Sequence, residues 1–197
     1  MEYLDNCYRE GKVLMNNIEI IYKKHKGKKT ENNIQAYIRK EGVWALFGKK
    51  DREYECLQVG KSKDVGYEII YDISCMQNLG FKEGTKKYVN EFGDYFELKY
   101  EEGIVQEYLY PHIKEQGYKV LLFLYVCDEN DEKKEKLLAW LTRAKYWRDL
   151  HRPFNEEQTN FYEKNKCSKI GTRKECLSWK SERGIKSFLK MIEWEVI

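Results

Sequence analysis

The feature that most constrains this chain is the apolar run Val120-Leu-Leu-Phe-Leu-Tyr-Val126. It follows a glycine at position 117 and precedes the polar segment Asp128-Glu129-Asn130-Asp131. A membrane helix needs roughly 20 apolar residues, so this run is too short to cross a bilayer. Its length is typical of a strand that is buried on both faces. The pattern therefore predicts a central strand over residues 119–127.

A hairpin is predicted upstream of that strand. Residues 42–47 and 54–59 are both strand-like, and the segment between them, Gly48-Lys-Lys-Asp-Arg52, is a polar turn of hairpin length. The helix expected next has an N-cap in Ser62 or Asp64, and its apolar residues recur on one side: Val65, Ile69, Ile73 and Met76. We therefore expect an α/β fold with a small, largely antiparallel sheet of three or slightly more strands, flanked by helices.

Helical spacing also appears outside this hairpin. It predicts a helical N-terminal extension over residues 1–40, a helix over 104–113 and a helix over about 132–150 that ends before Pro153. The expected organisation is a core over 41–157 with an insertion near 80–117. Residues 158–197 are expected to form a basic helical C-terminal extension.

Composition limits the broad class of the protein. The 197 residues carry 36 Lys and Arg against 33 Asp and Glu, so the net charge of +3 indicates no particular partner. A hydrophobic content of 42% with 35% charged residues is typical of a soluble globular protein. The N-terminal residues have no secretory signal pattern, and the cysteines form no CxxC pair. We therefore expect a cytoplasmic protein with reduced cysteines.

Positive charge is concentrated near the C-terminus. Between residues 164 and 190 there are nine basic residues against Glu175 and Glu182. Tyr162, Trp179 and Phe188 lie among them. Basic residues interleaved with aromatic ones suit a nucleic-acid backbone and stacked bases. The alternative is a surface helix whose apolar residues pack on the core.

Several short motifs follow one another in a recognisable order. Gly42-Val43-Trp44 opens the hairpin, and Gln58-Val59-Gly60 closes it, followed by Lys61-Ser62-Lys63-Asp64-Val65. Glu135-x-x-Leu138 and Arg152-Pro153-Phe154-Asn155 come later. This order resembles the GIY-YIG nuclease family over roughly residues 40–157.

The resemblance implies hydrolysis of nucleic-acid phosphodiesters, with DNA as the expected partner. The basic residues of the 164–190 segment are expected to contact that DNA. It also implies one divalent cation, Mg²⁺ or Mn²⁺, held by Glu135. A carboxylate-held cation stabilises developing phosphoryl charge, and a positioned base activates water. Lys61 is expected to contact phosphate, and Asn155 is expected to stabilise the site.

The chain departs from the family at the positions that activate water. Trp44 and Gln58 stand where the family has tyrosines, and Glu68 stands near the expected arginine. An indole donates a hydrogen bond but has no hydroxyl to accept a proton. Tyr67 and Tyr71, on the predicted helix, are candidates to replace the missing hydroxyls.

A second nuclease motif competes with this interpretation. Glu97-x-Lys99 lies in a strand-like stretch and resembles the second half of the PD-(D/E)xK motif. Asp72 or Asp64 is the evident upstream acid. In that chemistry two acids bind Mg²⁺ and the lysine orients water.

The sequence therefore leaves two functional hypotheses. One is a divergent GIY-YIG-like endonuclease of restriction or repair type. The other is a module on the same scaffold that no longer catalyses and binds nucleic acid or a protein partner. The sequence does not decide the oligomeric state.

Overall fold

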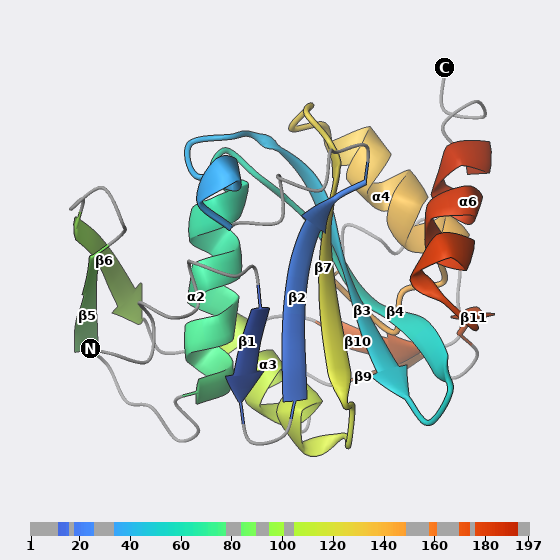
Figure 1. Cartoon of the computed structure of the whole chain (residues 1–197), viewed down its shortest axis with the longest axis horizontal. Helices are drawn as coiled ribbons and strands as arrows, with labels where there is room; N and C mark the ends of the chain where they lie inside the picture. The colour runs from blue at the N-terminus through green and yellow to red at the C-terminus, as the bar shows by residue number, and fades with distance from the viewer. Residues whose placement is uncertain are drawn as a thin grey trace.

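The structure is a computed structural model, and it describes residues 12–15, 18–25, 34–77, 84–89, 95–100, 105–148, 158–160, 170–173 and 176–192. Its centre is a six-stranded sheet in the order β1-β2-β7-β3-β4-β11 (Figure 1). The strands are β1 (Lys12–Met15), β2 (Ile18–Lys24), β3 (Gly42–Lys50), β4 (Glu53–Ser62), β7 (Val120–Cys127) and β11 (Ser178–Trp179). Only β2 and β7 pair in parallel within this sheet. The prediction of an α/β protein with a largely antiparallel sheet is confirmed, and the sheet is larger than the expected three strands.

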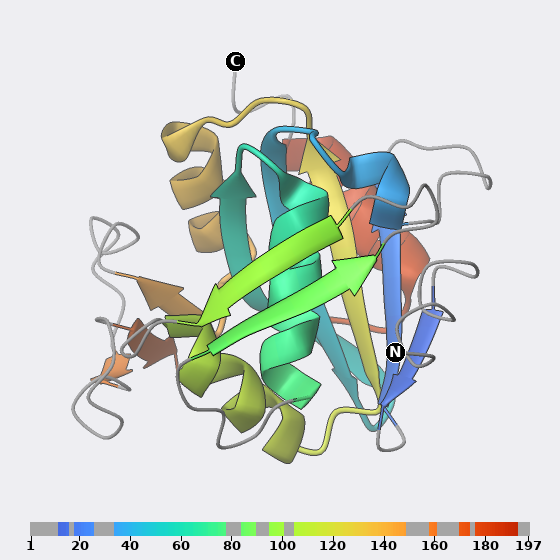
Figure 2. The ribbon, with the colours of Figure 1, turned by 90° about the vertical axis from the view of Figure 1, so that its left-hand side faces the viewer.

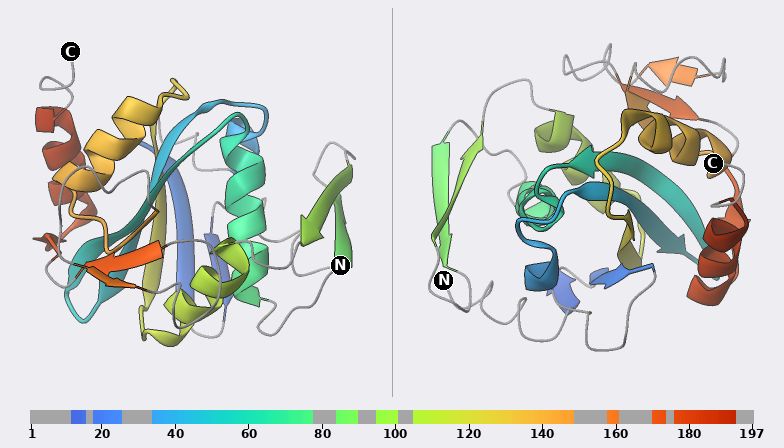
Figure 3. Two further views of the ribbon diagram at one scale, coloured as in Figure 1. Left: turned by 180° about the vertical axis from the view of Figure 1, so that it is seen from behind. Right: turned by 90° about the horizontal axis from the view of Figure 1, so that it is seen from above.

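Helices cover both faces of the sheet, as the view from above in Figure 3 makes clear. The face of the sheet that packs on α2 (Val65–Gln77) and α3 (Val105–Glu115) is called the first face, and its buried residues form the first core. The second face packs on α4 (Glu132–Leu141) and α6 (Glu182–Ile192). Because strand side chains alternate, Trp44 and Leu46 of β3 enter the first core, whereas Val43, Ala45 and Phe47 enter the second.

The apolar run that predicted a central strand forms β7, between β2 and β3. Leu121 and Phe123 are buried on the first face, and Leu122 and Leu124 on the second. The predicted hairpin is β3–β4, with Asp51 and Arg52 as its two-residue turn. Asp51 has a φ of 55°, which suits a turn whose first central residue is left-handed. Both predictions are confirmed.

The helical prediction for the N-terminal region is wrong over residues 12–15 and 18–24. These residues form β1 and β2, and Ile18, Ile20 and Tyr22 alternate into the first core. The apolar residues of β2 fit both the three-to-four spacing of a helix and the two-residue alternation of a strand. Pairing of β2 with β7 selects the strand.

The helix predicted over 132–150 is also too long. It begins after Asp131, which accepts a hydrogen bond from Lys133 N, and it ends at Leu141. Thr142 caps the helix, and Arg143 adopts a left-handed φ of 49°. The chain then enters β8 (Tyr146–Arg148). Pro153, the expected stop, lies outside the described residues.

The remaining elements lie around this core. The 3₁₀ turn η2 (Ile34–Tyr37) packs against α2. β5 (Gly84–Val89) and β6 (Tyr95–Tyr100) form the hairpin in the predicted insertion, in front of α2 in Figure 2. β8, β10 (Ile170–Arg173) and β9 (Gln158–Asn160) form a small sheet, so the C-terminal region is helical only in α6 among the described residues. No helix in the described part of the chain is long and apolar enough to span a membrane.

Candidate functional site

The sheet separates the residues that the sequence assigned to one site. Trp44, Gln58, Tyr67 and Tyr71 belong to the first face. Glu135 lies on α4, which covers the second face. The sequence interpretation required these groups to converge, and the described residues do not bring them together.

Trp44 is a core residue, 1% exposed, and it lies against Gly60 on the neighbouring strand. A Cβ atom at Gly60 would approach Cζ2 of the indole to 2.5 Å and Cε2 to 2.7 Å. Gly60 is therefore required for the close approach of the ring, rather than for a turn at the strand end. The indole Nε1 is buried and has no hydrogen-bond partner in the described part of the chain.

Gln58 takes part in a buried polar network beneath α2 and α3. The Tyr110 hydroxyl lies 2.6 Å from Oε1 of Gln58 and 2.7 Å from Oδ2 of Asp72. The single hydroxyl hydrogen of Tyr110 can be donated to only one of these two oxygens. The second hydrogen bond forms if the Gln58 side-chain amide is turned so that its nitrogen donates to the Tyr110 oxygen, or if a protonated Asp72 donates to that oxygen. Burial and then Asp72 raise the pKa of Tyr110 well above its usual value.

The candidate replacement hydroxyls do not lead toward Glu135. Tyr71 is buried in the first core, and Tyr67 packs against the same core from the first turn of α2. The backbone N–H of Tyr67 donates to Asp64 at 2.9 Å, so Asp64 is the N-cap predicted for this helix. Glu68 lies in the same first turn.

Glu135 and Lys61 share the second face. Glu135 lies on the buried side of α4 with Leu138 and Ala139, and α4 contacts β4. Lys61 pairs across the ladder with Val43, a residue of the second core. The hydrogen bond and charge of Lys136 lower the pKa of Glu132, and the charge of Lys61 acts in the same direction. The first turn of α4 thus lies within electrostatic reach of Lys61.

Two sequence interpretations depend on residues that the structure does not describe. Asn155 lies outside the described residues. Glu97 and Lys99 lie on β6, so the expected strand is confirmed. The structure does not describe their side chains. Of the acids proposed to act with them, Asp72 contacts Tyr110 and Asp64 caps α2.

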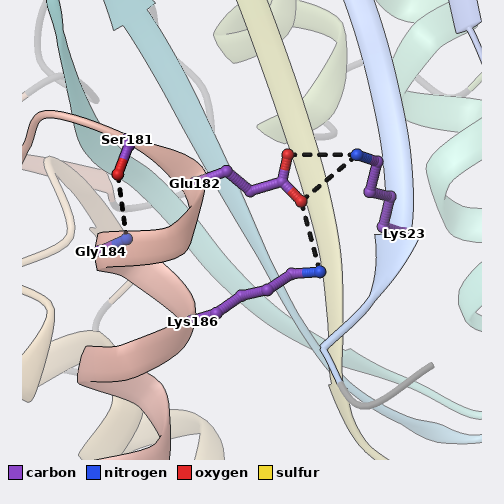
Figure 4. A network of polar contacts seen from close by, with 5 residues as sticks. All are labelled: Lys23, Ser181, Glu182, Gly184 and Lys186. Carbon is purple, nitrogen blue, oxygen red and sulfur yellow. Dashed lines mark hydrogen bonds and ion pairs between the residues drawn. The ribbon is translucent and has the colours of Figure 1, made fainter. Parts of the chain in front are cut away.

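The basic C-terminal segment is described in part, and α6 is its helical portion. Figure 4 shows Glu182 of α6 turned toward β2. Its carboxylate lies 3.1 Å from the Nζ atom of Lys23 in β2 and 3.3 Å from that of Lys186, one turn further along α6. The apolar side of α6 carries Ile185, Leu189 and Ile192 into the second core. The opposite side of α6 carries the exposed Arg183 and Lys190, and the exposed Lys180 lies just before the helix. None of the three forms an ion pair with a described residue. The two sequence interpretations of this segment thus correspond to opposite sides of one helix.

Sequence analysis missed a polar cluster where β4 meets β8. The Tyr118 hydroxyl donates to Glu55, and Lys145 Nζ lies 2.9 Å from Glu55 and 3.0 Å from that hydroxyl. Burial, then Glu55, raises the pKa of Tyr118 far above its usual range. The three residues are far apart in sequence, so no local spacing could have indicated them.

Within the described ranges, no group of three or more His, Cys, Asp or Glu residues is placed to hold a metal ion. Glu135, the residue predicted to hold the metal, lies among the described residues.

No family model, curated protein or solved structure matches this chain.

Proposed function

We propose that this protein is a nucleic-acid-binding module with a GIY-YIG-like core, and that it binds without hydrolysing phosphodiesters. The hairpin, helix, strand and helix follow in the order of the resembling motifs, as β3–β4, α2, β7 and α4. The observation that carries the proposal is the separation of Trp44 and Gln58 from Glu135 by the sheet. Water activation and metal binding need groups within reach of one phosphate.

The outward side of α6 supports nucleic acid as the partner. Lys180, Arg183 and Lys190 are exposed, while the acid of this helix, Glu182, is turned toward Lys23 and Lys186. Arg183 and Lys190 are two turns apart, about 10 Å at 1.5 Å per residue. Such a row suits successive phosphates of a polyanion.

A fluorescence anisotropy titration with labelled duplex DNA in Mg²⁺ or Mn²⁺ tests the proposal. We expect binding that weakens steeply with salt, and intact DNA on a denaturing gel after incubation. The double variant R183A/K190A should bind more weakly than K114A/K119A, a control with the same charge change at Lys114 of α3, which packs on the first face, and at Lys119, just before β7. Equal affinities for the two variants would contradict the role of α6.

The endonuclease remains a second candidate because Lys61 and the first turn of α4 share the second face. In this case Glu135 would hold the cation and Lys61 would contact phosphate. Cation-dependent cleavage that is lost in Glu135→Gln and kept in Glu132→Gln, an exposed acid of the same helix, would favour this candidate. Absence of cleavage by the wild-type protein would remove it.

A further inference from the structure

We infer that four cations at the end of the sheet where β4 terminates form a second phosphate-binding surface for the nucleic-acid backbone. We call Arg39, Lys40, Lys61 and Lys63 the edge cluster. The inference rests on the proposed function and adds a surface outside α6. It joins residues 39–40, just before β3, to residues 61–63, at the end of β4.

The fold brings these segments together through backbone contacts. Val65 N donates to the carbonyl of Lys40 at 2.8 Å, and Gly42 pairs with Ser62 at the end of the β3–β4 ladder. Gly66 permits this approach, since a Cβ there would lie 2.5 Å from the backbone nitrogen of Ile38. Figures 1 and 2 show η2, which leads into Arg39, beside the first turn of α2.

The edge cluster keeps an excess of positive charge among the described residues, although the charge of Lys61 also acts on Glu132. Arg39, Lys40 and Lys63 are exposed and Lys61 is half-buried. None of the four has a hydrogen bond or ion pair from its side chain to a described residue. Glu41 is the exposed acid of this segment.

Neighbouring acids are already engaged. Asp64 caps α2, Asp128 pairs with Lys24 at 3.0 Å, and Glu132 pairs with Lys136 at 2.7 Å. Among the described residues at this end of the sheet, the four cations outnumber the carboxylates of Glu41 and Asp64, and the excess creates a positive potential that attracts a polyanion.

The positive end of the α2 dipole adds to this potential. It is a minor contribution, because the N–H groups of Val65 and Tyr67 are already bonded within the protein. The side-chain cations therefore carry the inference. Because they come from two separate segments, their surface suits an extended backbone better than a single small anion.

The salt dependence of duplex binding tests the inference. Wild type, K61A/K63A, R183A/K190A and the control K114A/K119A are titrated with the same labelled duplex at several salt concentrations. Each lost phosphate contact lowers the slope of log K against log salt by about 0.9. We therefore expect K61A/K63A to lose up to about 1.8 from the slope, whereas the control keeps the wild-type slope. Thermal unfolding of each variant checks that it is folded.

The outcomes separate the inference from the proposed function. A wild-type slope in K61A/K63A, with a reduced slope in R183A/K190A, overturns the edge cluster and leaves the proposed function intact. No binding by the wild-type protein overturns both. The charge reversal Lys63→Glu provides a second readout, and an affinity equal to that of Lys119→Glu would also count against the edge cluster.

Discussion

At the scale of single residues, the pair of Trp44 and Gly60 explains why a nuclease-like motif here has a structural role. The indole occupies the space above Gly60, so the aromatic residue of the first motif packs on the glycine of the second. Cross-strand pairs of this kind stabilise sheets through side-chain contact. Trp44, at the position where the resembling family has a tyrosine, is thereby committed to the core.

Substitution of Gly60 tests this packing. We expect Gly60→Ala to lower the free energy of unfolding by about 1–3 kcal/mol, because the new methyl group overlaps the indole ring. Gly184→Ala in α6 is the matched control, since the nearest atom to its Cβ would be at 3.7 Å and alanine favours helices. Urea denaturation measures both. An unchanged stability in Gly60→Ala would contradict the close approach.

For the candidate site, residue identity was available from the sequence and burial was not. Trp44 and Gln58 lack the expected hydroxyls whatever the fold, so doubt about hydrolysis was available from the sequence. The burial of these two side chains depends on the tertiary fold, and the contact of Gln58 with Tyr110 joins residues that are 52 positions apart. Such long-range contacts leave no local pattern to interpret.

At the scale of elements, the end of α4 illustrates how a local cap overrides a helical pattern. Arg143 N donates to Trp140 O, and Ala144 N donates to Ala139 O. Together with the left-handed Arg143, these bonds form the C-terminal motif in which glycine is usually found. Helical spacing continued to Ala144, so the sequence offered no signal for this stop.

Substitution of Arg143 tests the cap. We expect Arg143→Gly to raise the free energy of unfolding by up to about 1 kcal/mol, because glycine adopts a left-handed φ without strain. Arg143→Ala removes the same guanidinium but keeps the strain, so it should show no such gain. Thermal or urea unfolding compares the two, and equal stabilities would contradict the interpretation.

Strand β2 shows the limit of periodicity for a short element. Its alternation of Ile18, Ile20 and Tyr22 is clear once its partner is known. The parallel pairing with β7 joins residues about a hundred positions apart, as in Ile20 with Leu121. Tertiary pairing therefore decided an element for which the local pattern allowed two solutions.

At the scale of the whole molecule, buried tyrosines link stability to alkaline pH. Burial is the first cause that raises the pKa values of Tyr54, Tyr110, Tyr118, Tyr125 and Tyr146. In the unfolded chain these phenols ionise near pH 10. Because the folded protein keeps them protonated, their stabilising contribution is complete below about pH 10 and is lost as pH rises further.

We therefore expect the free energy of unfolding to fall from about pH 10 to pH 12, by up to about 1.4 kcal/mol per pH unit for each of the deeply buried Tyr110, Tyr118 and Tyr146. Tyr54 and Tyr125 contribute less, because solvent screens them more. Urea denaturation at several pH values measures this slope. Tyr118→Phe should reduce the slope. A constant stability across this range would contradict the expectation.

The central claim is that one molecule binds nucleic acid on defined surfaces and leaves it intact. Backbone amide chemical shifts, recorded while the ¹⁵N-labelled protein is titrated with duplex DNA in Mg²⁺, test it most directly. The account predicts shifts concentrated in residues 180–190, 39–40 and 61–63, unmoved signals at 114–119, and uncleaved DNA at the end. Shifts centred elsewhere, no shifts at all, or cleaved DNA would contradict it.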